Sequence, residues 1–299
     1  MTAGPLLAAV EAGGTKFLCA LVRDTVTIAR MRIVTADPDA TFAAVAAFFA
    51  DRLGPIAAAG VASFGPIDLD PASPGYGRLT TTPKPGWSGV DLLGRVRAIV
   101  GAPVAVDTDV NAAAVAEARA GGIDGRLAYV TVGTGIGVGV AERGRPLPGA
   151  HAEGGHIRVP RAPDDAFAGT CPWHGDCLEG LAAGPALAMR WGVPAEALAA
   201  DHPAWAVEAH YLAALCLSLT YLIRPERIVL GGGVAAMPGL HDRVRARFAA
   251  LAAGYALDRH SARPAAYIVP PRLADAGLHG ALLLAEALAD PPSPAPPPC

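Results

Sequence analysis

Residues 6–22 read LLAAVEAGGTKFLCALV, in which two apolar runs flank the polar glycine segment EAGGTK at residues 11–16. Two β-rich runs around a glycine turn predict a hairpin. The pattern returns at residues 127–140, LAYVTVGTGIGVGV, around a Gly-Thr-Gly turn. Helical and further strand patterns follow each hairpin. This partial internal repeat predicts two α/β lobes with a ligand held in the cleft between them.

The remaining elements follow from hydrophobic periodicity. Helices are predicted at 41–53, 90–100, 110–120, 183–191, 206–223, 238–252 and 276–289, and further strands at 56–64, 104–107 and 227–230. We therefore expect a small α/β domain at residues 1–112, with helix 276–289 packing back on it, and a large α/β domain at 113–275. Residues 68–88 and 149–180 are expected to form irregular loops, and the Pro-rich residues 290–299 are expected to form a disordered tail.

Composition excludes several classes of protein. Hydrophobic residues make up 52% and charged residues 17% of the 299 residues, which excludes disorder for most of the chain. A net charge of −3 supplies no basic field for nucleic acid. The apolar runs are short and interrupted, and the N-terminus has no basic residue before its apolar stretch, so neither a membrane span nor a secretory signal is expected. Five cysteines, an odd number, do not fit a disulfide framework, and we expect a cytoplasmic protein.

The glycine turns are candidates for phosphate binding. Phosphate oxygens need close approach of backbone N–H groups, which glycine permits, and a hydroxyl or amine donor nearby. The turns at residues 13–16 and 133–135 supply both, and a third run, Gly231-Gly232-Gly233, follows a predicted strand. None of them matches a Walker loop or a dinucleotide-binding fingerprint. The alternative is that these are ordinary hairpin turns.

A candidate catalytic carboxylate lies in Asp107-Thr108-Asp109, where a predicted strand runs into a helix. Such a carboxylate can accept a proton from a substrate hydroxyl within hydrogen-bond reach. The alternative is that one of these residues caps the helix. We expect both, with Asp107 or Thr108 in the structural role, Asp109 as the general base, and Asn111 as a further hydrogen-bonding group.

A candidate metal site lies in the loop at residues 151–180. His156, Cys171, His174 and Cys177 form a Cys2His2 set, and the Cys-x2-His-x2-Cys spacing lets ligands of one tight loop converge. A loop without its own core is the usual context for structural zinc. A surface loop with free cysteines is the alternative, and the C-x5-C spacing weakens a redox pair.

Two carboxylates flank the predicted metal ligands. Glu153 precedes His156, and Glu179 follows Cys177. A pinned loop would give both carboxylates fixed positions, suited to bidentate recognition of vicinal hydroxyls on a sugar. The alternative for either residue alone is an ordinary solvated surface position.

Taken together, these segments resemble the ROK family of sugar kinases and sugar-responsive repressors, and within it the bacterial fructokinase branch. The resemblance extends from about residue 6 to residue 289. The segments that carry it are EAGGTKF at 11–17, SFGPID at 63–68, TTTPKPGW at 80–87, DTDVN at 107–111, VGTGIGVGV at 132–140, Gly149, EGGH at 153–156 and the loop at 171–180.

The resemblance implies an actin-like (ribonuclease H-like) ATPase fold, with two α/β domains around a cleft that binds ATP and a sugar. It implies a structural Zn²⁺, Mg²⁺ with ATP, and a homodimer. It implies Asp109 as the catalytic base. The implied sugar-binding residues are Gly65, Pro66, Thr108, Asp109, Glu153, His156 and Glu179. The implied nucleotide-binding residues are Gly13, Gly14, Thr15, Lys16, Thr134, Gly135, Gly231, Gly232 and Gly233.

The sequence also departs from the family pattern. Many members carry Asp where Glu11 stands, which leaves a magnesium contact of Glu11 open, and Asn where Thr108 stands. Glucokinases of the family commonly have a three-cysteine zinc loop, whereas His174 replaces one thiol here, as fits the fructokinase branch better.

We therefore expect an ATP-dependent hexose kinase that converts D-fructose to fructose 6-phosphate. The alternatives are a kinase for glucose, mannose or N-acetylmannosamine, a sugar-sensing ROK regulator without a DNA-binding domain, and an actin-like structural ATPase. The first strand begins by Leu6, which leaves no room for an N-terminal helix-turn-helix, and the net charge of −3 also disfavours the regulator. The structural ATPase does not explain the predicted zinc loop.

Overall fold

The structure is a computed structural model that describes residues 4–51, 54–147 and 153–290. The chain forms two compact units: unit 1 comprises Met1–Ala116 with Asp275–Cys299, and unit 2 comprises Glu117–Ala274. The functional domain boundaries expected from the sequence, 1–112 with 276–289 and 113–275, stay a prediction. The Pro-rich residues 291–299 and Gly149 lie outside the described residues.

Unit 1 is built on a mixed sheet whose strands run in the order β3-β2-β1-β4-β5. The predicted N-terminal hairpin forms from β1 and β2, which pair antiparallel, while β4 pairs parallel with β1 on its other side. The strands are β1 Leu6–Ala12, β2 Lys16–Arg23, β3 Val26–Val34, β4 Ile56–Ser63 and β5 Val104–Thr108.

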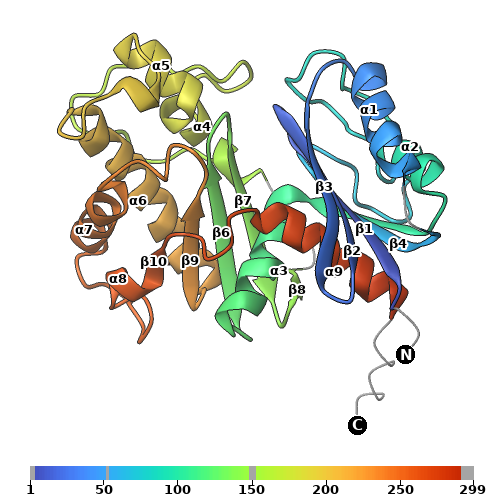
Figure 1. Cartoon of the computed structure of the whole chain (residues 1–299). Coiled ribbons are helices and arrows are strands. Elements are labelled where there is room, and N and C mark those ends of the chain that lie inside the picture. Colours follow the sequence, from blue (N-terminus) through green and yellow to red (C-terminus); the bar gives the residue numbers. More distant parts are fainter. Residues whose placement is uncertain (1–3, 52–53, 148–152, 291–299) are drawn as a thin grey trace. The chain divides into compact units, whose positions relative to one another are not determined.

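Helices cover both faces of the unit 1 sheet (Figure 1). Helices α1, Pro38–Ala50, and α2, Leu92–Val100, contribute to a core cluster with one face. Helix α9, Ala276–Ala289, packs on the other face with the beginning of α3, Asp109–Gly121. A Cβ on Gly60 of β4 would lie 1.8 Å from the backbone oxygen of Ala281, so α9 lies directly on the strand.

Unit 2 repeats the same pairing in a second sheet, of order β10-β9-β6-β7-β8. The predicted second hairpin forms from β6 and β7, and β9 pairs parallel with β6. Two matched α/β sheets of this kind confirm the expected fold class. The strands are β6 Arg126–Val132, β7 Ile136–Glu142, β8 Arg145–Pro146, β9 Arg227–Gly231 and β10 Ile268–Val269.

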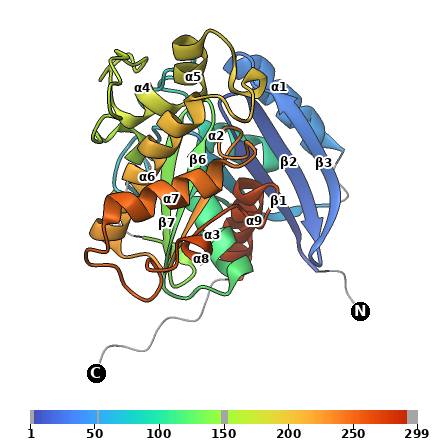
Figure 2. The ribbon, with the colours of Figure 1, turned by 90° about the vertical axis from the view of Figure 1, so that its left-hand side faces the viewer.

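The core of unit 2 joins one face of its sheet to α6 and α7, which lie in front of β6 and β7 in Figure 2. Apolar side chains of β6, β7 and β9 meet large side chains such as Tyr211 and Phe248 there. The helices of this unit after α3 are α4 Leu178–Ala182, α5 Gly184–Trp191, α6 Ala204–Ile223, α7 Leu240–Ala252 and α8 Pro264–Tyr267.

The structure adds elements that the periodicity did not predict. Residues 26–34 form the edge strand β3, most of whose side chains are exposed, so its sequence lacks a buried apolar face. Helix α4 forms inside the segment expected to be an irregular loop, because one turn of helix is too short to show periodicity. Strands β8 and β10 each span two residues and are below the length that alternation can indicate.

Helix α6 is long and apolar enough to cross a membrane when judged by length and composition alone. Core helices of globular domains pass the same test, and 56% of the apolar window of α6 is buried inside the unit. The helix also contains the buried Glu208 and His210. The packing of α6 explains its apolar composition as that of a core helix.

Candidate functional site

The first glycine turn joins β1 to β2 and closes with a hydrogen bond of 2.9 Å from Gly13 N–H to the Lys16 oxygen. A Cβ on Gly13 would lie 2.7 Å from that oxygen, whereas a Cβ on Gly14 would meet nothing within 4 Å. Thr15 is exposed. Gly13 is therefore required by the turn itself, while there is open space beside Gly14 and Thr15 is exposed.

The second glycine turn joins β6 to β7 and contacts the predicted sugar-binding residue Glu179. The Glu179 carboxylate accepts a hydrogen bond of 2.9 Å from Ile136 N–H, and a Cβ on Gly135 would lie 2.6 Å from the same oxygen. Gly133 receives a hydrogen bond of 2.7 Å from Gly184 N–H. Thr134 is exposed at the tip of the turn. Hydrogen bonds thus fix both ends of this turn, whereas Thr134 at its tip is exposed.

The third glycine run has a clear packing role. Gly232 adopts a φ of +93°, and a Cβ there would lie 2.3 Å from the Val132 oxygen. A Cβ on Gly231 would lie 2.7 Å from the Tyr129 hydroxyl. Only Gly233 would meet nothing within 4 Å. Two of the three glycines are thus explained by the close approach of β9 to β6.

The connection from β5 to α3 positions the predicted base. Asp107 accepts hydrogen bonds from Thr108 N–H at 2.7 Å and from the Asn111 amide at 2.8 Å. The Thr108 hydroxyl accepts a hydrogen bond of 3.1 Å from Asn111 N–H and so caps the helix. Asp109, the first residue of α3, accepts a hydrogen bond of 2.9 Å from Val110 N–H.

Asp107 differs in its pKa from an ordinary exposed carboxylate. Burial raises the pKa of Asp107 above its usual value, and its hydrogen bonds from Asn111 and Thr108 oppose that increase. The Asp107 side chain is therefore a hydrogen-bonded part of the local structure. The role of Asp109 as the base stays a prediction.

Gly65 and Pro66 follow β4 and are joined by a cis peptide bond. The Pro66 oxygen accepts a hydrogen bond of 2.8 Å from Thr80 N–H, which ties this turn to the loop at residues 68–88. Trp87, in the same loop, is buried and donates its indole N–H to the Ala36 oxygen at 3.0 Å. The loop is therefore well ordered without being regular.

Glu11 lies on β1 against the N-terminal end of α9. A Cβ on Gly277 would lie 2.8 Å from the Glu11 carboxylate. Burial raises the pKa of Glu11, while the charge of Lys16 and a hydrogen bond from Leu278 N–H oppose the rise. Within the described part of the chain the Glu11 Oε2 atom is buried and has no hydrogen-bond partner.

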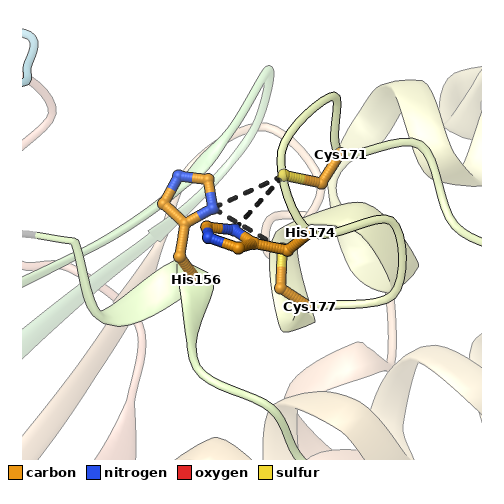
Figure 3. A group of neighbouring side chains, drawn as sticks. All are labelled: His156, Cys171, His174 and Cys177. Carbon is orange, nitrogen blue, oxygen red and sulfur yellow. Dashed lines mark hydrogen bonds between the residues drawn. The ribbon is translucent and has the colours of Figure 1, made fainter. Parts of the chain in front are cut away.

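The four side chains predicted to hold a metal converge (Figure 3). His156 comes from a short 3-10 turn, Gly154–His156, and Cys177 immediately precedes α4. The ligand atoms of His156, Cys171, His174 and Cys177 all lie within 4.8 Å of one another. Sequence reasoning named the complete set, and folding closes the gap of 15 residues between His156 and Cys171.

Three sulfur–nitrogen distances within the cluster are close to those around a tetrahedral metal. Cys171 Sγ lies 3.7 Å from His156 Nδ1 and 3.6 Å from His174 Nδ1, and Cys177 Sγ lies 3.5 Å from His156 Nδ1. Zinc bonds of about 2.3 Å to sulfur and about 2.0–2.1 Å to nitrogen place tetrahedral S and N ligands about 3.6 Å apart. The donor set and its spacing therefore suit Zn²⁺.

The imidazole of His156 has two different neighbourhoods. Its Nδ1 atom faces the two thiols, whereas its Nε2 atom lies 3.6 Å from Glu153 Oε2 and 3.7 Å from Glu179 Oε1. The three side chains are between 20% and 32% exposed, so solvent reaches them. A metal held on Nδ1 would fix the imidazole and leave Nε2 and two carboxylates facing the same accessible space.

Sequence reasoning missed a buried ionic cluster in unit 2, formed by Asp165, Arg190, Glu208 and Tyr211. Asp165 and Arg190 lie too far apart in sequence for any local pattern to join them. Glu208 did leave a signal, because it is an acidic residue in a long apolar helix, AWAVEAHYLAAL at 204–215. A lone charge on a core helix indicates a buried partner.

The chain is similar to known proteins over nearly its whole length. The family model described as ROK family matches residues 7–288. A fructokinase from Pediococcus pentosaceus is 41% identical over 292 residues, which cover 94% of this chain and 98% of that protein. A fructokinase from Zymomonas mobilis is 43% identical over 290 residues, covering 93% and 95% respectively.

A solved structure gives the same assignment. The ROK family glucokinase from Streptomyces griseus, in complex with glucose and AMPPNP, superposes with a TM-score of 0.73 at 26% identity. The match covers 94% of this chain and 99% of that one. Family model, relatives and fold agree over nearly the whole length, and the chain belongs to the ROK family.

Proposed function

We propose that this chain is a fructokinase, which transfers the γ-phosphoryl group of ATP to D-fructose and forms fructose 6-phosphate and ADP. The observation that carries the proposal is the similarity to fructokinases at about 40% identity over nearly the full length of both chains. Each unit carries groups suited to that chemistry. Unit 1 has a glycine turn and the carboxylate of Asp109 at the start of α3, and unit 2 has a second glycine turn and a histidine between two carboxylates.

Phosphoryl transfer requires mainly positioning and charge neutralisation. The sugar primary hydroxyl attacks the γ-phosphorus, the bond from that phosphorus to the β,γ-bridging oxygen breaks, and ADP leaves. Asp109 orients the attacking hydroxyl and accepts its proton. The backbone of Gly14 and the exposed residues Thr15 and Thr134 would bind the triphosphate.

The remaining nucleotide-binding residues follow the sequence prediction. Lys16 and Gly135 are the last residues of the two turns. Gly233 is the member of the third run at which a Cβ would meet nothing within 4 Å. Mg²⁺ bound with ATP would neutralise phosphate charge. The buried Glu11 Oε2 atom, close in sequence to the first turn, has no hydrogen-bond partner among the residues that the structure describes. Gly13, Gly231 and Gly232 act through the backbone geometry that they permit.

Sugar recognition is assigned to Glu153, His156 and Glu179, with Gly65, Pro66 and Thr108 as further contacts. Carboxylates accept hydrogen bonds from vicinal hydroxyls, and a ring nitrogen of an imidazole can form one as well. Zn²⁺ on His156, Cys171, His174 and Cys177 would order this group of residues and take no part in the transfer. The metal is thus structural in this proposal.

Three expectations from the sequence extend the proposal. The domains are residues 1–112 with helix 276–289, and residues 113–275 with the zinc loop at 151–180. The protein acts as a homodimer, and it acts in the cytoplasm. Size-exclusion chromatography with light scattering tests the dimer directly.

The test of function is a coupled assay of ADP formation with Mg-ATP against fructose, mannose, glucose and N-acetylmannosamine in one buffer. Fructose should give the highest kcat/KM, with mannose second and glucose poor. A hydroxyl in the wrong place leaves buried groups unpaired at about 1–3 kcal/mol each, so two misplaced hydroxyls give about 30-fold discrimination or more. A glucose value equal to that of fructose would contradict the fructokinase and leave a hexose kinase.

A further inference from the structure

The segment between the first and second predicted metal ligands needs an external support. Residues 157–170 join His156 to Cys171 and form neither helix nor strand. Ordering such a segment costs conformational entropy that its own contacts must offset. Several contacts hold it, among them ion pairs of Arg158 and Arg161 with Asp176. From outside the segment, Arg190 of α5 adds an ion pair with Asp165 and a contact with the Phe167 ring.

Arg190 forms a buried ion pair with the segment. Its Nη1 atom lies 2.6 Å from Asp165 Oδ2, and the two side chains are 8% and 7% exposed. The guanidinium carbon also lies 4.4 Å from the centroid of the Phe167 ring. Burial alone would raise the pKa of Asp165, but hydrogen bonds from Arg190 and Tyr211 outweigh that effect and hold it below the usual value.

The same guanidinium also holds α4. Arg190 Nη2 donates a hydrogen bond of 3.0 Å to the backbone oxygen of Leu181. Leu181 lies in the helix that begins directly after Cys177 and carries Glu179. One planar guanidinium group therefore connects the segment before Cys171 to the helix after Cys177.

Helix α6 completes the support. The Tyr211 hydroxyl donates to Asp165 and accepts a hydrogen bond of 3.3 Å from Ala162 N–H. His210 Nε2 donates to the Pro160 oxygen at 3.0 Å, while its Nδ1 atom accepts from Arg247 at 2.8 Å. The segment is thus attached at three successive points to core helices of unit 2.

A second buried acid, Glu208 of α6, also interacts with the charge of Arg190. Glu208 is 1% exposed, and its Oε1 atom has no hydrogen-bond partner among the described residues. Burial raises the pKa of Glu208 well above its usual value, and the charge of Arg190 only partly opposes this. Burial thus disfavours the charge of Glu208, whereas Arg190 makes its ion pair with Asp165 of the segment.

We infer that Arg190 is a positioning residue of the metal and sugar site: it touches neither, but it sets the relative places of Cys171, Cys177 and Glu179. The inference rests on the proposed function for its sugar readout and on the Cys2His2 site for its metal readout. Residues that orient metal ligands typically change metal affinity by about 10–100-fold when replaced.

The experiment compares Arg190→Met and Arg190→Lys with the parent chain and with Arg243→Met. Arg243 is a matched control, since it is an exposed arginine of unit 2 that donates to a backbone oxygen, that of Ala200 at 3.1 Å. The readouts are zinc transfer to a chromogenic chelator, the KM for fructose and the KM for Mg-ATP. Tyr211→Phe removes one hydroxyl and leaves the Arg190–Asp165 pair in place.

In Arg190→Met we expect about 10–100-fold weaker zinc retention. The KM for fructose should rise, with little change in the KM for Mg-ATP. Arg190→Lys keeps a positive charge for Asp165 but loses the hydrogen bond to the Leu181 oxygen. Its zinc retention and its KM for fructose should therefore lie between those of the parent and those of Arg190→Met. Tyr211→Phe should shift both readouts in the same direction by less, and Arg190→Lys decides the matter if Arg190→Met does not fold. Arg243→Met should match the parent.

Unchanged zinc retention and fructose KM in Arg190→Met would overturn the inference, as would an equal rise in both KM values. If Arg190→Met does not fold, unchanged readouts in Arg190→Lys, which loses the hydrogen bond to Leu181, would overturn it. A parent chain that holds no zinc would contradict the metal site and overturn the inference with it. A parent chain that holds zinc but does not phosphorylate fructose would contradict only the proposed function, because the zinc readout still tests Arg190.

Discussion

The carboxylate of Glu179 accepts a hydrogen bond of 2.9 Å from the backbone N–H of Ile136, and its other oxygen lies 3.7 Å from His156 Nε2. One side chain thus joins the glycine turn at residues 133–135 to the histidine of the metal cluster. In the proposed enzyme the turn serves ATP and the histidine serves the sugar, so Glu179 links the two functions physically.

Two different substitutions of Glu179 should distinguish its effect on sugar binding from its effect on ATP binding. Glu179→Gln keeps an acceptor for Ile136 N–H but loses the charge, so it should raise the KM for fructose alone. Glu179→Ala also leaves the N–H unpaired, at about 1–3 kcal/mol, and should raise the KM for Mg-ATP as well. Steady-state kinetics with each substrate varied in turn measures both. Identical ATP kinetics in the two variants would show that the turn does not depend on this bond.

Asp109→Asn should lower kcat by about 10²–10⁴-fold, the usual loss for a positioned base, without changing the thermal midpoint. Asp107→Asn is the control, because asparagine retains an oxygen that accepts from Thr108 and Asn111. It should keep most of its turnover. Near-normal turnover in purified Asp109→Asn would remove Asp109 from the base role.

The two glycines of the first turn should respond differently to alanine. Gly13→Ala should lower the thermal midpoint, because its Cβ would lie 2.7 Å from the Lys16 oxygen. Gly14→Ala meets nothing within 4 Å, so its stability should match the parent while its KM for Mg-ATP rises. Thermal unfolding and ATP kinetics on both variants decide between a simple hairpin turn and a phosphate-binding turn. A Gly14→Ala enzyme with unchanged ATP kinetics would favour the simple turn.

The protein should contain one Zn²⁺ per chain, measured by elemental analysis of freshly purified, unchelated protein. Cys171→Ser should lose the metal and show a raised KM for fructose together with lower stability, because His156 then lacks its fixed orientation. Cys216→Ala is the control, since Cys216 is a buried cysteine of α6 outside the cluster. Less than about a tenth of an equivalent of zinc would contradict ordinary Cys2His2 occupancy.

Glu208 should make stability depend on pH. Its folded pKa lies well above the ordinary value of 4.5, so the folded state holds a proton that the unfolded chain releases. Stability from this group is therefore complete below pH 4.5 and declines as the pH rises towards the folded pKa. Glu208→Gln mimics the protonated form and should raise the thermal midpoint at pH 8 more than at pH 5.

The exposed Glu196 provides the control for this prediction, because Glu196→Gln should leave the pH dependence of the thermal midpoint as it is in the parent. Differential scanning fluorimetry of all three proteins across that pH range is sufficient. A Glu208→Gln gain that is equal at both pH values would mean that packing, and not protonation, is responsible.

The sequence by itself determined the features that are local. The two hairpins follow from apolar runs around glycine turns, and the cluster Cys171, His174 and Cys177 follows from spacing within one loop. Backbone conformation over a few residues depends mainly on those residues, so the repeat of two α/β sheets was predictable. The position of Asp109, where a strand runs into a helix, was predictable for the same reason.

Tertiary structure alone decided the contacts between distant segments. It brought Glu179 to Ile136, divided the two nitrogens of His156 between thiols and carboxylates, and buried Asp165 against Arg190. It also formed the exposed edge strand β3, whose side chains show no buried face. These features depend on how whole elements pack, and packing is a property of surfaces that meet only after folding, so local periodicity carries no record of it.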